Sequence, residues 1–286
     1  MCKVSVLMPI FKTKEKYLRE SIDSILNQTY TNFEFIILDD CPEDSREKII
    51  KEYKDNRIIY KKNDKNLGIS ASRNKLLNLA QGEYIAIFDH DDISVPERLE
   101  KQVAYLDTHP FVGVVSGQLE YIVGEHYITK HPEFNLDIKK ELMHRDIVAH
   151  TAMMIRKSLI NQTGIHYESL YSPCEDYMLV LRLVEYTMFY NLQEVLVKYR
   201  NSEENTTHLQ SQKMMDADAL CRCFAYRKYP YLYKQKENIS NYDSNNTIYW
   251  IKIFDIIPLI KIKNKNNKTN VFLFGIIKIF SIKNKS

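Results

Sequence analysis

The sequence predicts an α/β fold with a doubly wound, mostly parallel central sheet. Strand-like apolar runs alternate four times with helical patterns over residues 1–110, as is typical of such sheets. The fourth run, residues 84–88, is almost continuously apolar, as expected for a strand covered on both faces. With 286 residues, 44% of them hydrophobic, the chain is long enough to bury this core.

The first half is expected to contain four strand–helix pairs. Apolar runs predict strands at residues 4–8, 33–38, 58–60 and 84–88, and helical spacing predicts helices at residues 14–27, 45–53 and 69–80. A fourth helix is expected to begin at Pro96, because Ser94 and Glu97 have the spacing of a capping box.

The second half is expected to add a small antiparallel part. Residues 112–116 and 119–123 are predicted as paired strands, followed by a helix at 136–143 and a strand at 147–156. Gly164 is expected to end a helix, since glycine suits the left-handed position there. A helix that opens at Glu175 and short strands near Phe189 and at 195–199 complete the predicted fold.

Acidic residues follow two of the buried strands. Asp89 and Asp91 come after residues 84–88, and Asp39 and Asp40 end the second strand. Parallel strands end at one edge of a sheet, where ligands bind. In an extended chain Asp89 and Asp91 point the same way and are able to hold a divalent cation. Acids after a strand often only cap turns, but a second acid pair on the same edge favours a site.

Several other patterns are absent from the sequence. Neither G-x-G-x-x-G after the first strand nor G-x-x-x-x-G-K-[ST] occurs, so carboxylates and a metal ion would replace a glycine-rich phosphate loop. The 5 cysteines are scattered, which favours free thiols in a reducing compartment. The net charge of +3 gives no reason to expect nucleic acid as a partner. No apolar leader and no run long enough to span a membrane is found, so a cytoplasmic protein is expected.

The C-terminal residues are basic and apolar. No acidic residue follows Asp255, while seven lysines alternate with isoleucine, leucine and phenylalanine. This composition is typical of segments that lie on an anionic membrane surface. A solvated basic tail, or a hairpin packed on the body of the protein, would also account for it.

Six motifs follow one another along the chain: Val4-Ser-Val-Leu-Met-Pro-Ile-Phe; Ser24-Ile-Leu-Asn-Gln-Thr-Tyr; Ile37-Leu-Asp-Asp; Asn66-Leu-Gly with Ser72-Arg-Asn; Gly82-Glu-Tyr-Ile to Asp92; and Glu175-Asp-Tyr. Together, over residues 4 to 200, they resemble the inverting family-2 glycosyltransferases with the GT-A fold.

The resemblance implies roles for the donor-side residues. Asp91 would bind a divalent metal, Mn²⁺ or Mg²⁺, and Asp89 would lie near the ribose. The nucleotide-binding set would further comprise Pro9, Phe11, Asp40, Asn66 and Arg73, with Asp40 at the uracil edge and Pro9 and Phe11 as the wall of the base pocket. Phe11 and Lys12 stand where tyrosine and asparagine are common, so stacking is kept and a hydroxyl contact is lost.

On the acceptor side, the resemblance makes Asp176 the catalytic base. His150 is left without a role, since a lone histidine in an apolar strand is more often structural. His208 follows Asn205-Thr-Thr in a polar loop, where folding over a nucleotide stays open. Glu175 and Asp176 also suit the first turn of a helix for a purely structural reason, the helix dipole.

The resulting expectation is a metal-dependent inverting glycosyltransferase. It would move a sugar, most simply from a UDP-linked donor, to a hydroxyl of a lipooligosaccharide, capsule or other surface glycan. Residues 1–205 would form the GT-A domain, with a nucleotide half (1–110) and an acceptor half (111–205), and residues 206–286 a helical, basic appendage. Oligomeric state stays open.

Two alternatives are weighed against it. A sugar-phosphate nucleotidyltransferase would carry a Gly-x-Gly-Thr-Arg type of loop after the first strand, which residues 9–12 do not resemble. A non-catalytic protein that binds sugar nucleotides would not need Asp89, Asp91 and Asp176 together.

Overall fold

The computed structural model describes residues 2–201, 211–233, 248–253, 257–265, 268–273 and 277–283. The chain forms two compact units, Met1–Lys228 and Tyr229–Ser286. The division therefore lies after residue 228, whereas the sequence suggests one near residue 205.

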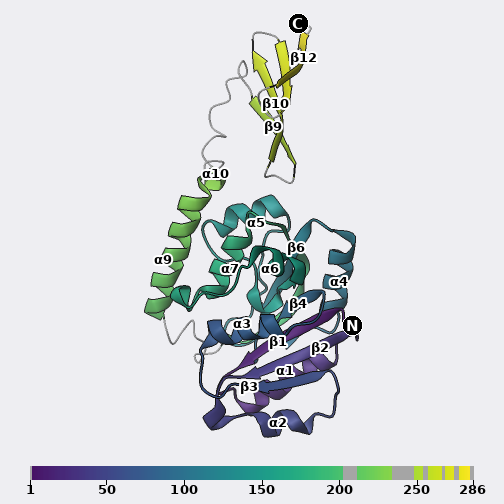
Figure 1. Cartoon of the computed structure of the whole chain (residues 1–286), viewed down its shortest axis with the longest axis vertical. Helices are drawn as coiled ribbons and strands as arrows, with labels where there is room; N and C mark the ends of the chain where they lie inside the picture. The colour runs from purple at the N-terminus through teal and green to yellow at the C-terminus, as the bar shows by residue number, and fades with distance from the viewer. Residues whose placement is uncertain are drawn as a thin grey trace. The chain divides into compact units, whose positions relative to one another are not determined.

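The first unit is built around an eight-stranded sheet with the strand order β3-β2-β1-β4-β7-β6-β8-β5 (Figure 1). Strands β1 to β4 pair in parallel, and β6 pairs with β8 in parallel, while β7 and β5 join their neighbours antiparallel. This arrangement confirms the predicted fold class. The strands are β1 (Val4–Ile10), β2 (Phe33–Asp39), β3 (Ile58–Lys62), β4 (Tyr84–Ile87), β5 (Ile93–Ser94), β6 (Val112–Tyr121), β7 (Met154–Arg156) and β8 (Met188–Tyr199).

Helices connect and cover these strands. In chain order they are α1 (Glu15–Leu26), α2 (Glu47–Glu52), α3 (Ile69–Leu79), α4 (Arg98–Thr108), α5 (Asn135–Leu142), α6 (Lys157–Thr163), α7 (Glu175–Leu183) and α9 (Ser211–Lys228), with short 3₁₀ turns η1 (Pro42–Asp44), η2 (His150–Ala152) and η3 (Ser169–Tyr171). As predicted, α6 ends at Gly164, which has a left-handed φ of 65°.

The core lies on both sides of β1. Every residue of β1 is buried, and alternate residues such as Val6 and Met8 pack in one cluster with Leu18 and Ile22 of α1. The apolar run is continuous because helices cover both faces of a mostly parallel sheet.

Three strand predictions in the second half are wrong. Residues 112–123 do not form a pair of strands: Val112–Tyr121 is one strand, and the register shift at Gly117 is an irregularity in its pairing with β8. The short strands near Phe189 and at 195–199 are likewise one strand, β8. Of residues 147–156 only Met154–Arg156 is a strand, because η2 precedes it.

The predicted capping box is also wrong. Helix α4 begins at Arg98 and has no side-chain cap. Ser94 instead lies in β5, where its hydroxyl accepts a hydrogen bond from Gln28 at 3.1 Å. Tertiary pairing of residues 93–94 with β8 thus overrides the local helix signal.

The second unit contains α10 (Pro230–Tyr233) and a four-stranded antiparallel sheet of order β12-β11-β10-β9. Its strands are β9 (Ile248–Ile253), β10 (Ile257–Lys265), β11 (Lys268–Leu273) and β12 (Ile277–Lys283). These residues form strands where a helical region is expected, because lysine alternates with β-branched and aromatic residues at the two-residue period of a strand. Among the described residues, no helix is long and apolar enough to cross a membrane.

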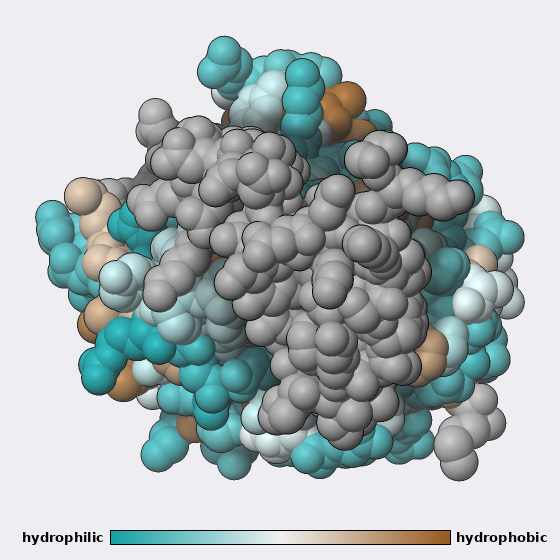
Figure 2. Space-filling view, turned by 90° about the horizontal axis from the view of Figure 1, so that it is seen from above, coloured by the Kyte–Doolittle hydropathy of each residue, from teal (hydrophilic) through white to brown (hydrophobic). Residues whose placement is uncertain are grey.

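Hydrophobic side chains are scattered over the surface of the described residues. On the face drawn in Figure 2, the coloured residues are mostly hydrophilic, with hydrophobic ones among them. The exposed large hydrophobic residues are correspondingly spread over several elements, for example Phe111, Phe134, Leu170 and Tyr226.

Candidate functional site

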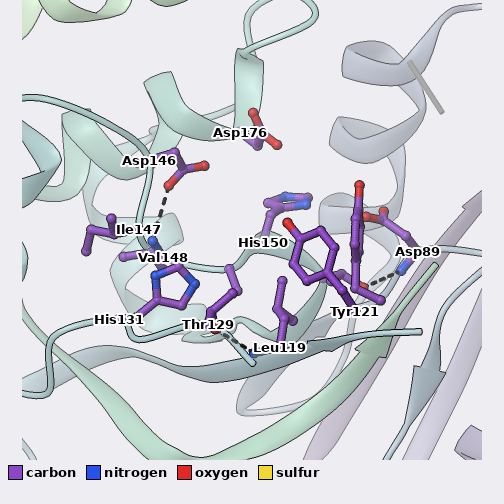
Figure 3. A pocket seen from close by; sticks show the side chains of 13 residues that line it. Asp89, Leu119, Tyr121, Thr129, His131, Asp146, Ile147, Val148, His150 and Asp176 are labelled. Atoms are coloured by element: carbon purple, nitrogen blue, oxygen red, sulfur yellow. Dashed lines mark hydrogen bonds between the residues drawn. The ribbon is translucent and has the colours of Figure 1, made fainter. Parts of the chain in front are cut away.

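A cavity of about 230 Å³ opens at the carboxyl ends of the strands in the first unit. Figure 3 shows Asp146 and Asp176 together on one side of it, with His150 between Asp176 and Asp89 in this view. Its lining comes from the exit of β4, β6, β8, η2, α7 and the loops on either side of α5. It comprises Asp89, Leu119, Tyr121, Thr129, His131, Asp146, Ile147, Val148, Ala149, His150, Thr151, Asp176 and Tyr199. Asp89 and Asp176, which lie far apart in the sequence, thus share one cavity.

Asp89 is held by an arginine from α3. The Arg73 Nη2 lies 3.3 Å from Asp89 Oδ1, and the backbone N–H of Asp89 donates to the hydroxyl of Thr151 at 3.2 Å. Burial opposes ionisation of Asp89, but the Arg73 guanidinium holds the pKa of this carboxyl below its ordinary value. Asp89 is therefore charged at neutral pH.

The chain turns sharply after Asp89. Strand β4 ends at Ile87, and His90 and Asp91 lie in a turn, so the expectation of an extended backbone from Asp89 to Asp91 is wrong. Asp89 lines the cavity, whereas Asp91 does not. Burial and the nearby Asp89 raise the pKa of Asp91 above its ordinary value.

The turn is fixed by two further arginines. The backbone N–H of Arg200, after β8, donates to Asp92 Oδ1 at 2.9 Å, and its Nε donates to the carbonyl of Asp91 at 2.8 Å. Arg98, fully buried in α4, donates to the carbonyl of Ile87 at 2.8 Å. Asp92 thus anchors the turn and has no part in the cavity lining.

Asp176 lies in the first turn of α7, as predicted. Burial, followed by the neighbouring Glu175, raises the pKa of Asp176 to about 6. The Tyr177 N–H donates to its Oδ1 at 2.8 Å. A carboxylate with this pKa is mostly ionised at neutral pH and is basic enough to accept a proton in a reaction.

The acid pair after β2 is engaged in hydrogen bonds. Asp39 accepts bonds from the hydroxyls of Ser45 and Tyr60 and from the backbone N–H groups of Cys41 and Arg46. Asp40 accepts from Asn63 Nδ2 at 2.7 Å and from the backbone N–H groups of Leu67 and Gly68 at 2.8 and 2.9 Å. Asp40 therefore shapes the loop that carries Asn66.

Pro9, Phe11 and Asn66 lie at the same end of β1 to β3, outside the cavity lining. Pro9 is buried within β1, while Phe11 is 42% exposed directly after it. Asn66 is exposed in the loop held by Asp40. An exposed aromatic ring beside a preformed loop suits a base-stacking surface, and the nucleotide-binding roles of these residues stay predictions.

The carboxylate of Asp91 suits a cation whose other ligands come from a substrate and from water. Asp91 is partly buried, and Nδ1 of the neighbouring His90 lies 3.9 Å from Asp91 Oδ1. Among the described residues, no group of three or more His, Cys, Asp or Glu side chains is able to hold a metal ion. One or two carboxylates completed by phosphate oxygens and water is the usual arrangement for Mg²⁺.

Sequence reasoning missed several cavity residues. Tyr121 and Tyr199 stand opposite each other at the carboxyl ends of β6 and β8. The rule that parallel strands present ligand-binding residues at these ends would have found both, had β6 and β8 been recognised as single strands. Asp146 and His131 lie on irregular segments and carry no such signal.

Comparison with known proteins supports the motif-based interpretation. The family model described as glycosyl transferase family 2 matches residues 5–169. An uncharacterized glycosyltransferase of Methanocaldococcus jannaschii is 36% identical over 262 residues, which cover 88% of this chain and 84% of that protein. The UDP-Glc:alpha-D-GlcNAc-diphosphoundecaprenol beta-1,3-glucosyltransferase WfaP of Escherichia coli is 32% identical over 186 residues, 63% of this chain and 70% of WfaP.

A solved structure supports the fold. S. aureus TarS 1-349 in complex with UDP-GlcNAc has a TM-score of 0.63 and 22% identity, covering 77% of this chain. The chain spans 65% of that TarS chain, and at this identity the likeness shows the GT-A fold alone. The matched family model and the identity to the M. jannaschii protein show that the chain is a glycosyltransferase and belongs to glycosyl transferase family 2.

Proposed function

We propose that the chain is a metal-dependent, inverting glycosyltransferase that uses a UDP-linked sugar and extends a surface or lipid-linked glycan. The observation that carries this proposal is the shared cavity, which both Asp89 and Asp176 line. The UDP donors named for WfaP and for the TarS complex, and the lipid-linked acceptor named for WfaP, support the substrate classes.

In this scheme Asp176 is the base. The acceptor hydroxyl attacks the anomeric carbon, its proton passes to a carboxylate oxygen of Asp176, and the bond from that carbon to the diphosphate oxygen breaks. Such proton transfer contributes about 10²–10⁴-fold. A single displacement inverts the configuration at the anomeric carbon.

Asp91 is the residue that would hold Mn²⁺ or Mg²⁺, with Asp89 in a supporting role near the ribose. When bound, the cation would neutralise charge that develops on the leaving diphosphate. Phe11 would stack on the base, and the loop fixed by Asp40 would border it. Arg73 lowers the pKa of Asp89 and so keeps it ionised. The charged carboxylate would then be able to accept hydrogen bonds from the ribose of the donor.

The test is release of nucleotide diphosphate from a panel of nucleotide sugars with Mn²⁺ and hydroxyl acceptors that include lipid-linked GlcNAc. One UDP-sugar is expected to react, and Asp176→Asn is expected to lower turnover by about 10²–10⁴-fold while UDP still binds. Asp137→Asn, an exposed change in the first turn of α5, serves as the matched control.

Other results would replace the proposal. Full turnover by Asp176→Asn would mean that another group is the base. Pyrophosphate release from a nucleoside triphosphate and a sugar phosphate would favour a nucleotidyltransferase, and UDP binding without any transfer would favour a non-catalytic protein.

We also infer peripheral contact of the chain with the inner, anionic face of the cell membrane. The support is compositional: seven lysines and no acidic residue follow Asp255. Each basic residue near such a surface is worth about 1 kcal/mol, so the segment is able to contribute substantial affinity.

A further inference from the structure

Two consecutive residues of α3 connect the end of β4 to segments of the acceptor half. Arg73 is 9% exposed and bridges two acids: its Nη1 lies 2.6 Å from Glu175 Oε1, and its Nη2 lies 3.3 Å from Asp89 Oδ1. Asp89 follows β4, and Glu175 opens α7, directly before Asp176.

The next residue, Asn74, holds a second segment. Its Nδ2 donates to the carbonyl of Tyr167 at 2.8 Å, and its Oδ1 accepts from the N–H of Tyr167 at 2.9 Å. The Arg73 guanidinium lies 5.5 Å from the centre of the Tyr167 ring. The Tyr167 hydroxyl lies 2.9 Å from Nε2 of His150, a residue of the cavity wall. The connection thus reaches the cavity along two routes.

The Arg73–Glu175 ion pair is buried, and few other hydrogen bonds satisfy its polar atoms. Glu175 is 3% exposed, and both Glu175 Oε2 and Arg73 Nε lack a hydrogen-bond partner among the described residues. Breaking a buried ion pair leaves an uncompensated charge, whereas the intact pair adds little net stability. Such a pair is better explained by the geometry that it enforces than by the stability that it adds.

The adjacent carboxylates of Glu175 and Asp176 at the start of α7 therefore have different surroundings. Glu175 contacts Arg73, and Asp176 lines the cavity. We propose that Arg73 and Glu175 are positioning residues that fasten the start of α7, and with it Asp176, to the strand end that carries Asp89, while Asn74 fixes Tyr167 to α3. The inference rests on the proposed function, in which Asp176 is the base and Asp89 lies on the donor side.

The test compares Glu175→Gln, Glu175→Asp and Arg73→Lys in the full chain. Each change weakens the bridge: glutamine has no charge, aspartate is too short, and lysine cannot contact two carboxylates as a guanidinium fork does. We expect Glu175→Gln to lower kcat by about 10²-fold, the loss typical of a small misplacement of a catalytic group. The Kd for UDP, measured by calorimetry, is expected to change less than about 2-fold, because the change removes no predicted nucleotide-binding residue and keeps the contact of Arg73 with Asp89.

Hydrogen–deuterium exchange supplies a readout that does not need activity. Backbone N–H groups of residues 167–177 are expected to exchange faster in Glu175→Gln and Glu175→Asp than in the wild type. Glu52→Gln is the matched control, because Glu52 also pairs with an arginine, Arg19 at 2.7 Å, but on the exposed surface. It is expected to leave kcat, UDP affinity and exchange of residues 167–177 unchanged.

Two results would overturn the inference: wild-type kcat and exchange in Glu175→Gln, or a loss of UDP affinity as large as the loss of kcat. If Glu175→Gln does not fold, the same measurements on Glu175→Asp test the inference. This variant keeps the negative charge beside Arg73, so it is more able to fold. If no nucleotide sugar reacts at all, the proposed function fails, while exchange and UDP binding still test whether the bridge holds residues 167–177.

Discussion

Two carboxylates of one cavity have opposite electrostatic surroundings. Arg73 holds the pKa of Asp89 below its ordinary value against the effect of burial, whereas burial and Glu175 raise the pKa of Asp176 to about 6. Environments that separate the pKa values of two acids commonly separate their roles. Asp89 is suited to remain charged, and Asp176 to take up a proton.

The raised pKa of Asp176 predicts the pH dependence of the reaction. A base must be deprotonated, so kcat/KM is expected to rise with pH, to be half-maximal at a pH of about 6 and to level off above it. The measurement is the rate of UDP release at a series of pH values. The residual activity of Asp176→Asn should lack this rise, and a rise that persists in this variant would assign it to another group.

Asp40 offers a prediction about binding and stability together. Asp40→Ala removes the acceptor for Asn63 and for the N–H groups of Leu67 and Gly68, and unsatisfied buried donors cost about 1–3 kcal/mol. Urea unfolding should show that loss, and calorimetry should show weaker UDP binding. Asp64→Ala, an exposed change in the same loop, is the control, and equal behaviour of the two variants would contradict the prediction.

At the scale of elements, the close approach of β4 to β1 depends on a glycine. A Cβ at Gly82 would lie 2.6 Å from the backbone nitrogen of Ser5 and 2.7 Å from the carbonyl carbon of Val4. Backbone atoms cannot move aside as a flexible side chain can. The position of β4, and therefore of Asp89 beyond its end, requires the absence of a side chain here.

Gly82→Ala is therefore expected to destabilise the first unit by about 1–3 kcal/mol, the usual effect of overpacking. The change in the free energy of unfolding is measured in urea. Gln81→Ala, an exposed neighbouring position, should lie within about 0.5 kcal/mol of the wild type. Equal stability of the two variants would show that β1 and β4 are able to separate without loss.

At the scale of the whole molecule, the site lies within the first unit. Every residue of the cavity lining belongs to Met1–Lys228. The second unit contains the lysine-rich strands, and its predicted partner is an anionic membrane. Nucleotide binding and membrane contact are thus expected to be separable.

A chain that ends at Tyr233 should bind UDP with unchanged affinity and react with a soluble acceptor at the rate of the full chain. The full chain should sediment with vesicles that contain anionic lipid, less so at high salt because screening weakens the attraction, and the shortened chain should not. Vesicles of neutral lipid are the control. Equal sedimentation of both chains would place membrane contact, if any, in the first unit.

The sequence alone determined the strand–helix order of the first half and the motifs that resemble family-2 glycosyltransferases. The reason is that buried strands, helix spacing and acids at strand ends are local patterns. Only the tertiary structure decided that residues 112–121 and 188–199 each form one strand, since pairing across the sheet tolerates an irregularity that looks like a turn in sequence. It also decided that the chain turns at His90 and Asp91, that Asp89 and Asp176 meet in one cavity, and that Arg73 bridges Asp89 and Glu175. Contacts between residues so far apart in the chain depend on how the segments pack, and no spacing rule encodes them.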